Sequence, residues 1–223
     1  MAAQQDTYDS ILEHIPKSIP FVYKNKVWRL LNSAGGHDKK IMRTIIDKLD
    51  IMHSYYAEVL TSQFILFPPK VPYNNQIISE FFTTLIPYLK RHYIDNAPAI
   101  QLGRISYLWV REQSTSDKPH YHCVLWLNED KINSSYRILT LTKQLWCEQF
   151  GGTLSMPDNN YYISKRLQAD SGVSLQEVIC RLSYLAKNAT KGCHSSKIKR
   201  YGASKLKNKS KSEQAPYKNN KKV

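Results

Sequence analysis

The most informative stretch of this chain is Pro119-His120-Tyr121-His122-Cys123-Val124-Leu125-Trp126-Leu127. Side chains in a β-strand alternate between two faces, so the two histidines share one face with Val124 and Trp126. Both faces are apolar beyond the histidines, which is typical of a strand in the middle of a covered sheet. Residues two apart in a strand lie about 7 Å apart at the backbone, so both imidazoles can reach one divalent metal ion at the open end.

A His-x-His pair also occurs as two hydrogen-bonded surface histidines, so the preceding strand matters. Residues 105–112 are rich in strand formers, and residues 114–118 are polar and typical of a turn. If the hairpin centre falls near Ser116, Glu112 lies opposite His120 on the same face. Two imidazoles and a carboxylate suit Mn²⁺ or Mg²⁺ with open positions, and Zn²⁺ less exclusively. A register slip of one residue would turn Glu112 away.

The composition limits the class of protein. The chain has 223 residues, a formal net charge of +14 and a pI of about 9.5, which predicts one domain with additions and a polyanionic partner, most simply nucleic acid. The first residues lack a signal peptide, and no apolar run approaches the roughly 18 residues of a membrane span. We therefore expect a soluble, cytoplasmic protein with no membrane contact. Four cysteines without a Cys-x-x-Cys pair argue against a zinc ribbon or a disulfide framework.

The periodicity of apolar residues predicts the order of elements. Helices are expected at 38–56, 75–89 and 135–150, and strands at 58–67, 105–112, 119–127 and 161–164. From residue 58 onward this order is strand, helix, strand, strand, helix, strand, which predicts a ferredoxin-like α+β fold (βαββαβ) with an antiparallel sheet. We assign residues 1–57 to a mostly helical N-terminal extension and residues 58–190 to the main domain.

A further helix begins at the capping box Ser174-Leu175-Gln176-Glu177. Its apolar residues form a continuous stripe, and at about 100° per residue Tyr184 falls almost opposite that stripe, with Lys187 and Lys191 beside it. Packing of the apolar stripe therefore does not explain why a tyrosine occupies position 184. Because the tyrosine must approach the His face of the sheet, we expect the stripe to face away from the histidines and to pack instead on the helix at 38–56 or on the helix at 135–150.

The chain becomes strongly basic after Thr190. Eleven lysines and arginines and one glutamate follow it, so ten of the fourteen net positive charges lie there. We predict that residues 191–223 form a basic, largely disordered tail, disordered from about Lys205 onward. A solvated end that aids solubility explains this composition as well as DNA binding does, although the tail must raise non-specific affinity for nucleic acid. The candidate nucleic-acid-binding residues are Arg181, Lys191, Lys197, Lys199 and Arg200.

A metal held by Glu112, His120 and His122 near a tyrosine suggests a reaction on DNA. The metal would polarise a phosphate oxygen of single-stranded DNA, and Tyr184 would attack phosphorus to give a phosphotyrosine and a free hydroxyl. Tyrosine has a reference pKa of about 10 and needs assistance as a nucleophile. Lys187, one turn on, could favour the phenolate or hold the scissile phosphate.

These residues carry a resemblance to a known family. The stretch Pro119-His120-Tyr121-His122 resembles the His-hydrophobic-His motif of HUH endonucleases, and Tyr184-Leu185-Ala186-Lys187 resembles their Tyr-x-x-Lys motif. Together with residues 109–113, 181–187 and 201–204, they are similar to the inovirus-type replication proteins and the YagK/YfjJ-like prophage proteins over roughly residues 58 to 205. The family's first motif is expected at 64–67.

The resemblance implies rolling-circle initiation in the cytoplasm of a bacterial host. The protein would nick a phage or plasmid replication origin, keep a 5′ phosphotyrosine and leave a 3′ hydroxyl that primes a host polymerase. It implies that His120 and His122 bind the metal, with Glu112 matching an acidic third ligand, that Tyr184 is the nucleophile and that Lys187 assists it. No Gly-x-x-x-x-Gly-Lys-Ser/Thr loop is present, so unwinding requires a separate helicase.

Other tyrosines and other functions stay open at this point. Tyr-x-x-Lys also occurs at residues 23–26, and Tyr162 and Tyr201 are lesser candidates, but initiators of this kind carry the tyrosine after the His motif. A single motif tyrosine means that a second cleavage needs another subunit, hence a dimer, or water. The alternatives are a catalytically silent DNA-binding phage or prophage regulator, a metal-dependent hydrolase that activates water, and a single-tyrosine HUH transposase.

Overall fold

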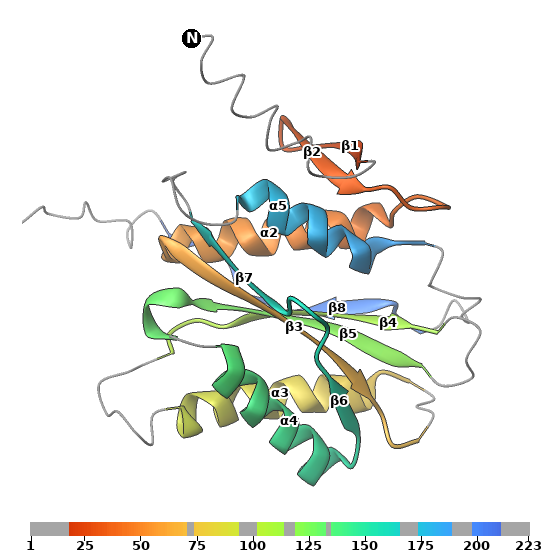
Figure 1. Cartoon of the computed structure of the whole chain (residues 1–223). Helices are drawn as coiled ribbons and strands as arrows, with labels where there is room; N and C mark the ends of the chain where they lie inside the picture. Colours follow the sequence, from red (N-terminus) through yellow and green to blue (C-terminus); the bar gives the residue numbers. More distant parts are fainter. Residues whose placement is uncertain are drawn as a thin grey trace, which may run out of the picture.

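The computed structural model describes residues 18–70, 74–93, 102–113, 119–132, 135–165, 174–188 and 198–210. In these residues the chain is a mixed α+β structure with an antiparallel sheet between two layers of helices (Figure 1). The strand order is β6-β3-β5-β4-β8, and β7 also pairs with β3. The strands are β3 (Glu58–Phe67), β4 (Ser106–Glu112), β5 (His120–Asn128), β6 (Thr153–Ser155), β7 (Tyr161–Lys165) and β8 (Tyr201–Ala203).

Different helices cover the two faces of the sheet. Helices α3 (Gln76–His92) and α4 (Ser135–Phe150) lie on one face. The other face carries α2 (Lys39–Tyr55), α5 (Leu175–Leu182) and the hairpin of β1 (Ser18–Tyr23) and β2 (Lys26–Leu31) (Figure 1). Two short 3₁₀ turns, η1 (Glu129–Lys131) and η2 (Ser183–Ala186), follow β5 and α5. The predicted helices and the predicted capping box at Ser174 are confirmed.

The alternation predicted for β5 is confirmed and divides the protein into two cores. Tyr121, Cys123, Leu125 and Leu127 pack with α3 and α4. The opposite face contributes Val124 and Trp126 to a core shared with α2, α5 and the hairpin. β5 lies between β3 and β4, so it is central in the sheet, as expected. The partly buried His end of β5 therefore continues from a strand that is packed by apolar residues on both faces.

The N-terminal region differs from the mostly helical extension expected for residues 1–57. Its described part contains α2, but residues 18–31 form a β-hairpin rather than a helix. The turn residues Lys24 and Asn25 have φ of 53° and 57°, as a two-residue hairpin turn requires. This hairpin packs on α5, and Trp28 and Leu30 join the core beneath it.

The basic C-terminal region also differs from expectation. Residues 201–203 form β8, which pairs with β4. Residues 204–210, expected to be disordered from about Lys205, lie along α2. The Lys48 ammonium donates a hydrogen bond to the carbonyl of Ser204, the Tyr55 hydroxyl donates to the carbonyl of Lys207 at 3.0 Å, and the Lys209 amide donates to Ser54 Oγ at 3.0 Å. Residues 211–223 lie outside the described part of the chain.

Among the described helices, none has the length and apolar character needed to cross a membrane.

Candidate metal and tyrosine site

The β4–β5 hairpin places three potential metal ligands together. Glu112 pairs with His120 across the two strands, and Val110 pairs with His122. Because side chains alternate along each strand, Glu112, His120 and His122 share the face that carries α2 and α5. The predicted register is therefore confirmed. We call these three residues the Glu-His-His triad.

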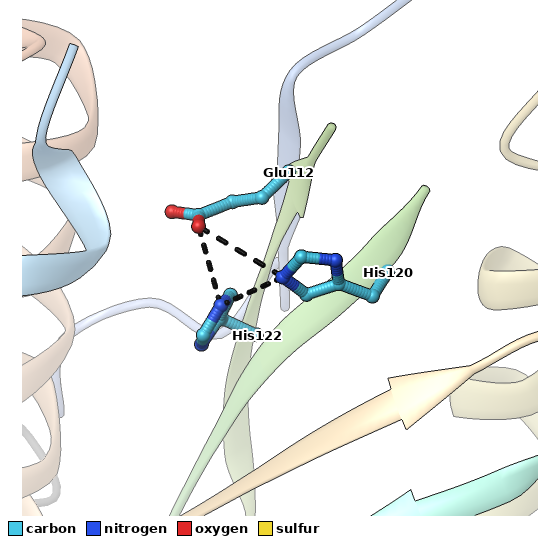
Figure 2. A group of neighbouring side chains, drawn as sticks. All are labelled: Glu112, His120 and His122. Carbon is cyan, nitrogen blue, oxygen red and sulfur yellow. Dashed lines mark hydrogen bonds and ion pairs between the residues drawn. The ribbon is translucent and has the colours of Figure 1, made fainter. Parts of the chain in front are cut away.

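The triad has the spacing of a metal centre. The Nε2 atoms of His120 and His122 are 3.2 Å apart, and Glu112 Oε2 lies 3.2 Å from His122 Nε2 and 4.0 Å from His120 Nε2 (Figure 2). Two donors each about 2.1 Å from a metal, and about 90–110° apart, are separated by about 3.0–3.4 Å. The three donors converge from one side, so a bound divalent ion would keep positions open for a substrate.

Burial favours metal binding at the triad. The Glu112 side chain is 3 % exposed, and a buried carboxylate is costly unless a cation or donors compensate it. Burial, and then the neighbouring His122, lower the pKa of His120, while Glu112 opposes the shift. A neutral imidazole keeps the lone pair that a metal requires. The chemistry of the donor set therefore fits a divalent cation.

An aromatic residue that the sequence analysis did not single out supports His120. Phe67, the last residue of β3, stacks on the His120 imidazole with ring centroids 5.5 Å apart and planes at 28°. Its side chain is also 39 % exposed beside the triad. The sequence feature that could have indicated Phe67 was its position at the end of the strand expected to carry the family's first motif.

Tyr184 lies beside the triad on a 3₁₀ turn rather than on a continuous helix. Helix α5 ends at Leu182 and the chain tightens into η2. The Tyr184 ring centroid is 5.9 Å from that of His122, and the side chain is 40 % exposed. Lys187 Nζ lies 4.0 Å from the Tyr184 ring centroid, within the range of a cation–π contact. The structure thus brings Glu112, His120, His122, Tyr184 and Lys187 together.

Two sets of contacts position the tyrosine. The apolar stripe of α5, including Val178, Ile179 and Leu182, packs with α2, which confirms the prediction that the stripe packs on the helix at 38–56. The stripe also joins the core on the His face of the sheet, so the expectation that it faces away from the histidines is wrong. After α5 the chain hydrogen-bonds to the loop at 35–38. The Asp38 amide donates to the Ala186 carbonyl at 2.7 Å, and Asn188 donates through its backbone amide and its side-chain Nδ2 to the carbonyls of residues 36 and 35 at 3.0 and 2.9 Å.

The other candidate tyrosines have different surroundings. The Tyr23 hydroxyl donates to both carboxylate oxygens of Asp47 at 3.1 Å. Tyr162, on β7, lies under the guanidinium of Arg181, 5.0 Å from the ring centroid. Tyr201 begins β8 and pairs with Val110. Tyr184, by contrast, has a ring contact with His122 of the triad.

The predicted DNA-binding cations divide into three groups. Arg181 stacks on Tyr162 instead of pointing to the triad. Lys199 and Arg200 immediately precede β8, and the Arg200 carbonyl accepts a hydrogen bond from the amide of Arg111, next to Glu112. Lys191 and Lys197 lie outside the described residues.

Comparison with known proteins gives one match. No curated protein and no solved structure matches this chain. The family model described as the YagK/YfjJ C-terminal domain matches residues 22–204, a range that runs from β1 to the residue after β8 and contains the triad, Tyr184 and Lys187. The chain therefore belongs to the YagK/YfjJ C-terminal domain family, a prophage-associated family.

Proposed function

We propose that this chain is a single-strand DNA endonuclease of the HUH type that starts rolling-circle replication at a phage, plasmid or integrated-element origin. The observation that carries the proposal is the position of Tyr184 against His122, with its ring centroid 5.9 Å from that of the imidazole. Residues from β4, β5 and the turn after α5, far apart in sequence, converge there. A metal-binding group, an exposed tyrosine and a lysine are the parts that this reaction needs.

The chain's own residues have distinct roles in the proposed reaction. Glu112, His120 and His122 would hold a Mg²⁺ or Mn²⁺ ion, which, when bound, supplies Lewis-acid polarisation of the scissile phosphate. Tyr184 loses its phenolic proton to solvent, and its oxygen forms a bond to phosphorus. The bond from phosphorus to the 3′ oxygen breaks, and that oxygen takes up a proton. The products are a 5′ phosphotyrosine and a free 3′ hydroxyl.

Lys187 supports the charge changes in this step. Its ammonium group lies 4.0 Å from the Tyr184 ring centroid, where its positive charge would attract the phosphate that Tyr184 attacks. Because the phosphotyrosine bond replaces a phosphodiester bond of similar kind, attack by a 3′ hydroxyl reverses the reaction. The same residues can therefore rejoin a strand without a nucleoside triphosphate.

The order of the strands is consistent with the proposal. The four-strand core reads β6/β7, β3, β5, β4, with α3 and α4 connecting it on one face. This order supports the proposal of a ferredoxin-like βαββαβ unit of the HUH nuclease type. In this function the chain acts on single-stranded origin DNA in a bacterial host, with a host polymerase, a helicase and, for a second cleavage, a second copy in a dimer.

A cleavage assay tests this function. Single-stranded oligonucleotides tiled over the genetic element that encodes the chain are incubated with the protein and Mn²⁺, and products are separated under denaturing conditions. We expect cleavage of particular single strands, none of the matching duplexes, and a DNA–protein species that survives denaturation. Tyr184→Phe should abolish both products, and Tyr162→Phe, the matched control, should retain them.

The alternatives predict different products. Cleavage without protein-linked DNA indicates a water-activating hydrolase, and binding without cleavage indicates a DNA-binding regulator. Transfer of one cleaved strand to a second DNA molecule as the main product indicates a transposase. A covalent species that persists in Tyr184→Phe contradicts the role of Tyr184.

A further inference from the structure

A basic cavity is lined by residues whose backbones hydrogen-bond to the segments that carry the candidate site. It has a volume of about 740 Å³ and opens between the first turn of α2 and the segment that enters β8. Its lining consists of Asp38, Lys39, Lys40, Lys199, Arg200 and Tyr201. We call it the basic groove.

The charges of the groove favour an anion. Four of its six lining residues are lysine or arginine, and the exposed side chains of these residues reach solvent. The one carboxylate, Asp38, is already engaged, because it caps α2 by accepting hydrogen bonds from the amides of Lys40 and Ile41 at 2.8 and 3.2 Å. The groove therefore presents a concentrated positive charge next to the first turn of a 17-residue helix, whose dipole adds to it.

Backbone hydrogen bonds connect the groove to both halves of the candidate site. On one wall, the Arg200 carbonyl accepts from the amide of Arg111, the residue before Glu112. On the other wall, the Asp38 amide donates to the carbonyl of Ala186, the residue before Lys187. The two walls of the groove are thus joined through the backbone to the segments that carry Glu112 and Lys187.

We propose that the basic groove binds the phosphodiester backbone of the single strand on one side of the scissile phosphate. This inference rests on the proposed function and deepens it, because it assigns a substrate-binding role to Lys39 and Lys40, which the sequence did not indicate. Tyr201 lines the same groove and offers an aromatic face to a base. Cations that neutralise phosphates release counterions, so their contribution appears in the salt dependence of binding.

The salt dependence of binding tests the groove without any need for catalysis. A fluorescent, mixed-sequence single-stranded oligonucleotide is titrated with protein in EDTA at several salt concentrations. For Lys39→Ala/Lys40→Ala we expect weaker binding and a slope of log affinity against log salt that is shallower by about 1.4, at roughly 0.7 per lost phosphate contact. Lys199→Ala/Arg200→Ala, on the opposite wall, should change the slope in the same direction.

The matched control is Lys90→Ala/Lys143→Ala, which removes two exposed lysines from α3 and α4 on the other face of the sheet. It should keep the wild-type slope, and circular dichroism checks that every variant is folded. Groove variants that are folded and bind with the wild-type slope overturn the proposal. An equally shallower slope of log affinity against log salt in the control also overturns it, since the effect would then depend on the total charge of the protein and not on the groove.

These outcomes are separable from a failure of the proposed function. Tyr184→Phe should bind with the wild-type slope, because the groove does not include it. If the wild type never cleaves DNA but the groove variants lose slope, the nuclease assignment fails and the groove stands. If the wild type cleaves through Tyr184 and the groove variants bind normally, only the groove fails.

Discussion

Glu112 is the most buried of the three potential metal ligands, and we expect metal binding to depend on it. Its side chain is 3 % exposed and 3.2 Å from His122 Nε2. Glu112→Gln keeps the shape and removes the charge, so we expect divalent affinity to fall by more than the roughly 10–100-fold typical of losing an outer-shell partner. Mn²⁺ titration followed by electron paramagnetic resonance measures this. Wild-type affinity in Glu112→Gln would show that the carboxylate is not a ligand.

Metal should stabilise the folded chain through the same triad. A ligand that binds only the folded state adds about 2.7 kcal/mol at a concentration one hundred times its dissociation constant. We therefore expect Mn²⁺ to raise the melting temperature of the wild type in differential scanning fluorimetry, and EDTA to reverse the rise. His122→Ala should show no rise, and His92→Ala, a histidine of α3 on the other face, should behave as the wild type. An equal rise in His122→Ala would place the ion elsewhere.

The Tyr184 hydroxyl can be separated from the rest of its side chain. Tyr184→Phe keeps the ring beside His122 and under Lys187 and removes only the hydroxyl oxygen, which is the proposed nucleophile. The side chain is 40 % exposed, so we expect a change in unfolding free energy within about 0.5 kcal/mol. Urea denaturation measures this, and a substantially larger loss would indicate a structural role for the hydroxyl.

The loop at 35–38, before α2, forms hydrogen bonds with the end of η2 and with Asn188. Gly36 has φ of +69°, and a Cβ built there meets no atom within 4 Å, so a substitution is limited by the backbone and not by space. Gly36→Ala should cost about 1–2 kcal/mol of unfolding free energy, and Gly36→Asn should cost less because asparagine tolerates this conformation better. Urea denaturation of the pair tests this. Equal stability of Gly36→Ala and the wild type would contradict the account of the loop.

Residues 204–210 form hydrogen bonds with the C-terminal half of α2. The Lys48 ammonium donates to the carbonyls of Ser204 and Leu206, and burial lowers its pKa. Lys48→Met keeps the apolar stem and leaves these carbonyls without their donor, which should cost about 1–3 kcal/mol. Hydrogen exchange should rise at residues 204–210, and Lys39→Met, an exposed lysine of the same helix, should leave it unchanged.

Elements with a local signal could be predicted from the sequence. The alternation of β5 gave its two faces, and the length of the turn gave the Glu112–His120 register. The hairpin β1–β2 could not be predicted so directly, because its turn depends on the left-handed backbone conformation of Lys24 and Asn25. The strand β8 could not be predicted so directly either, because it forms by pairing with β4, about ninety residues earlier. The end of α5 at Leu182 is likewise set by distant contacts, since the loop at 35–38 binds η2.

The same distinction applies to the candidate site. The His-x-His spacing and the Tyr-x-x-Lys spacing identified the residues, but neither could place Tyr184 against His122, because that requires α5 to pack on α2. Phe67, Lys39 and Lys40 were missed for the same reason. Each reaches the site through tertiary structure and carries no spacing signal of its own.

Across the whole molecule, the two helical layers have separate tasks. The layer of α3 and α4 completes a dry core, and the layer of α2, α5 and the hairpin carries the tyrosine and one wall of the basic groove. The sheet between them presents the Glu-His-His triad at one end.

The most direct measurement is mass spectrometry of the protein after reaction with single-stranded DNA and Mn²⁺, followed by nuclease and protease digestion. We predict a nucleotide phosphate attached to the peptide that contains Tyr184, dependent on His120 and His122. A nucleotide on the peptide of Tyr23, Tyr162 or Tyr201, or cleaved DNA with no modified peptide, would contradict the proposed reaction.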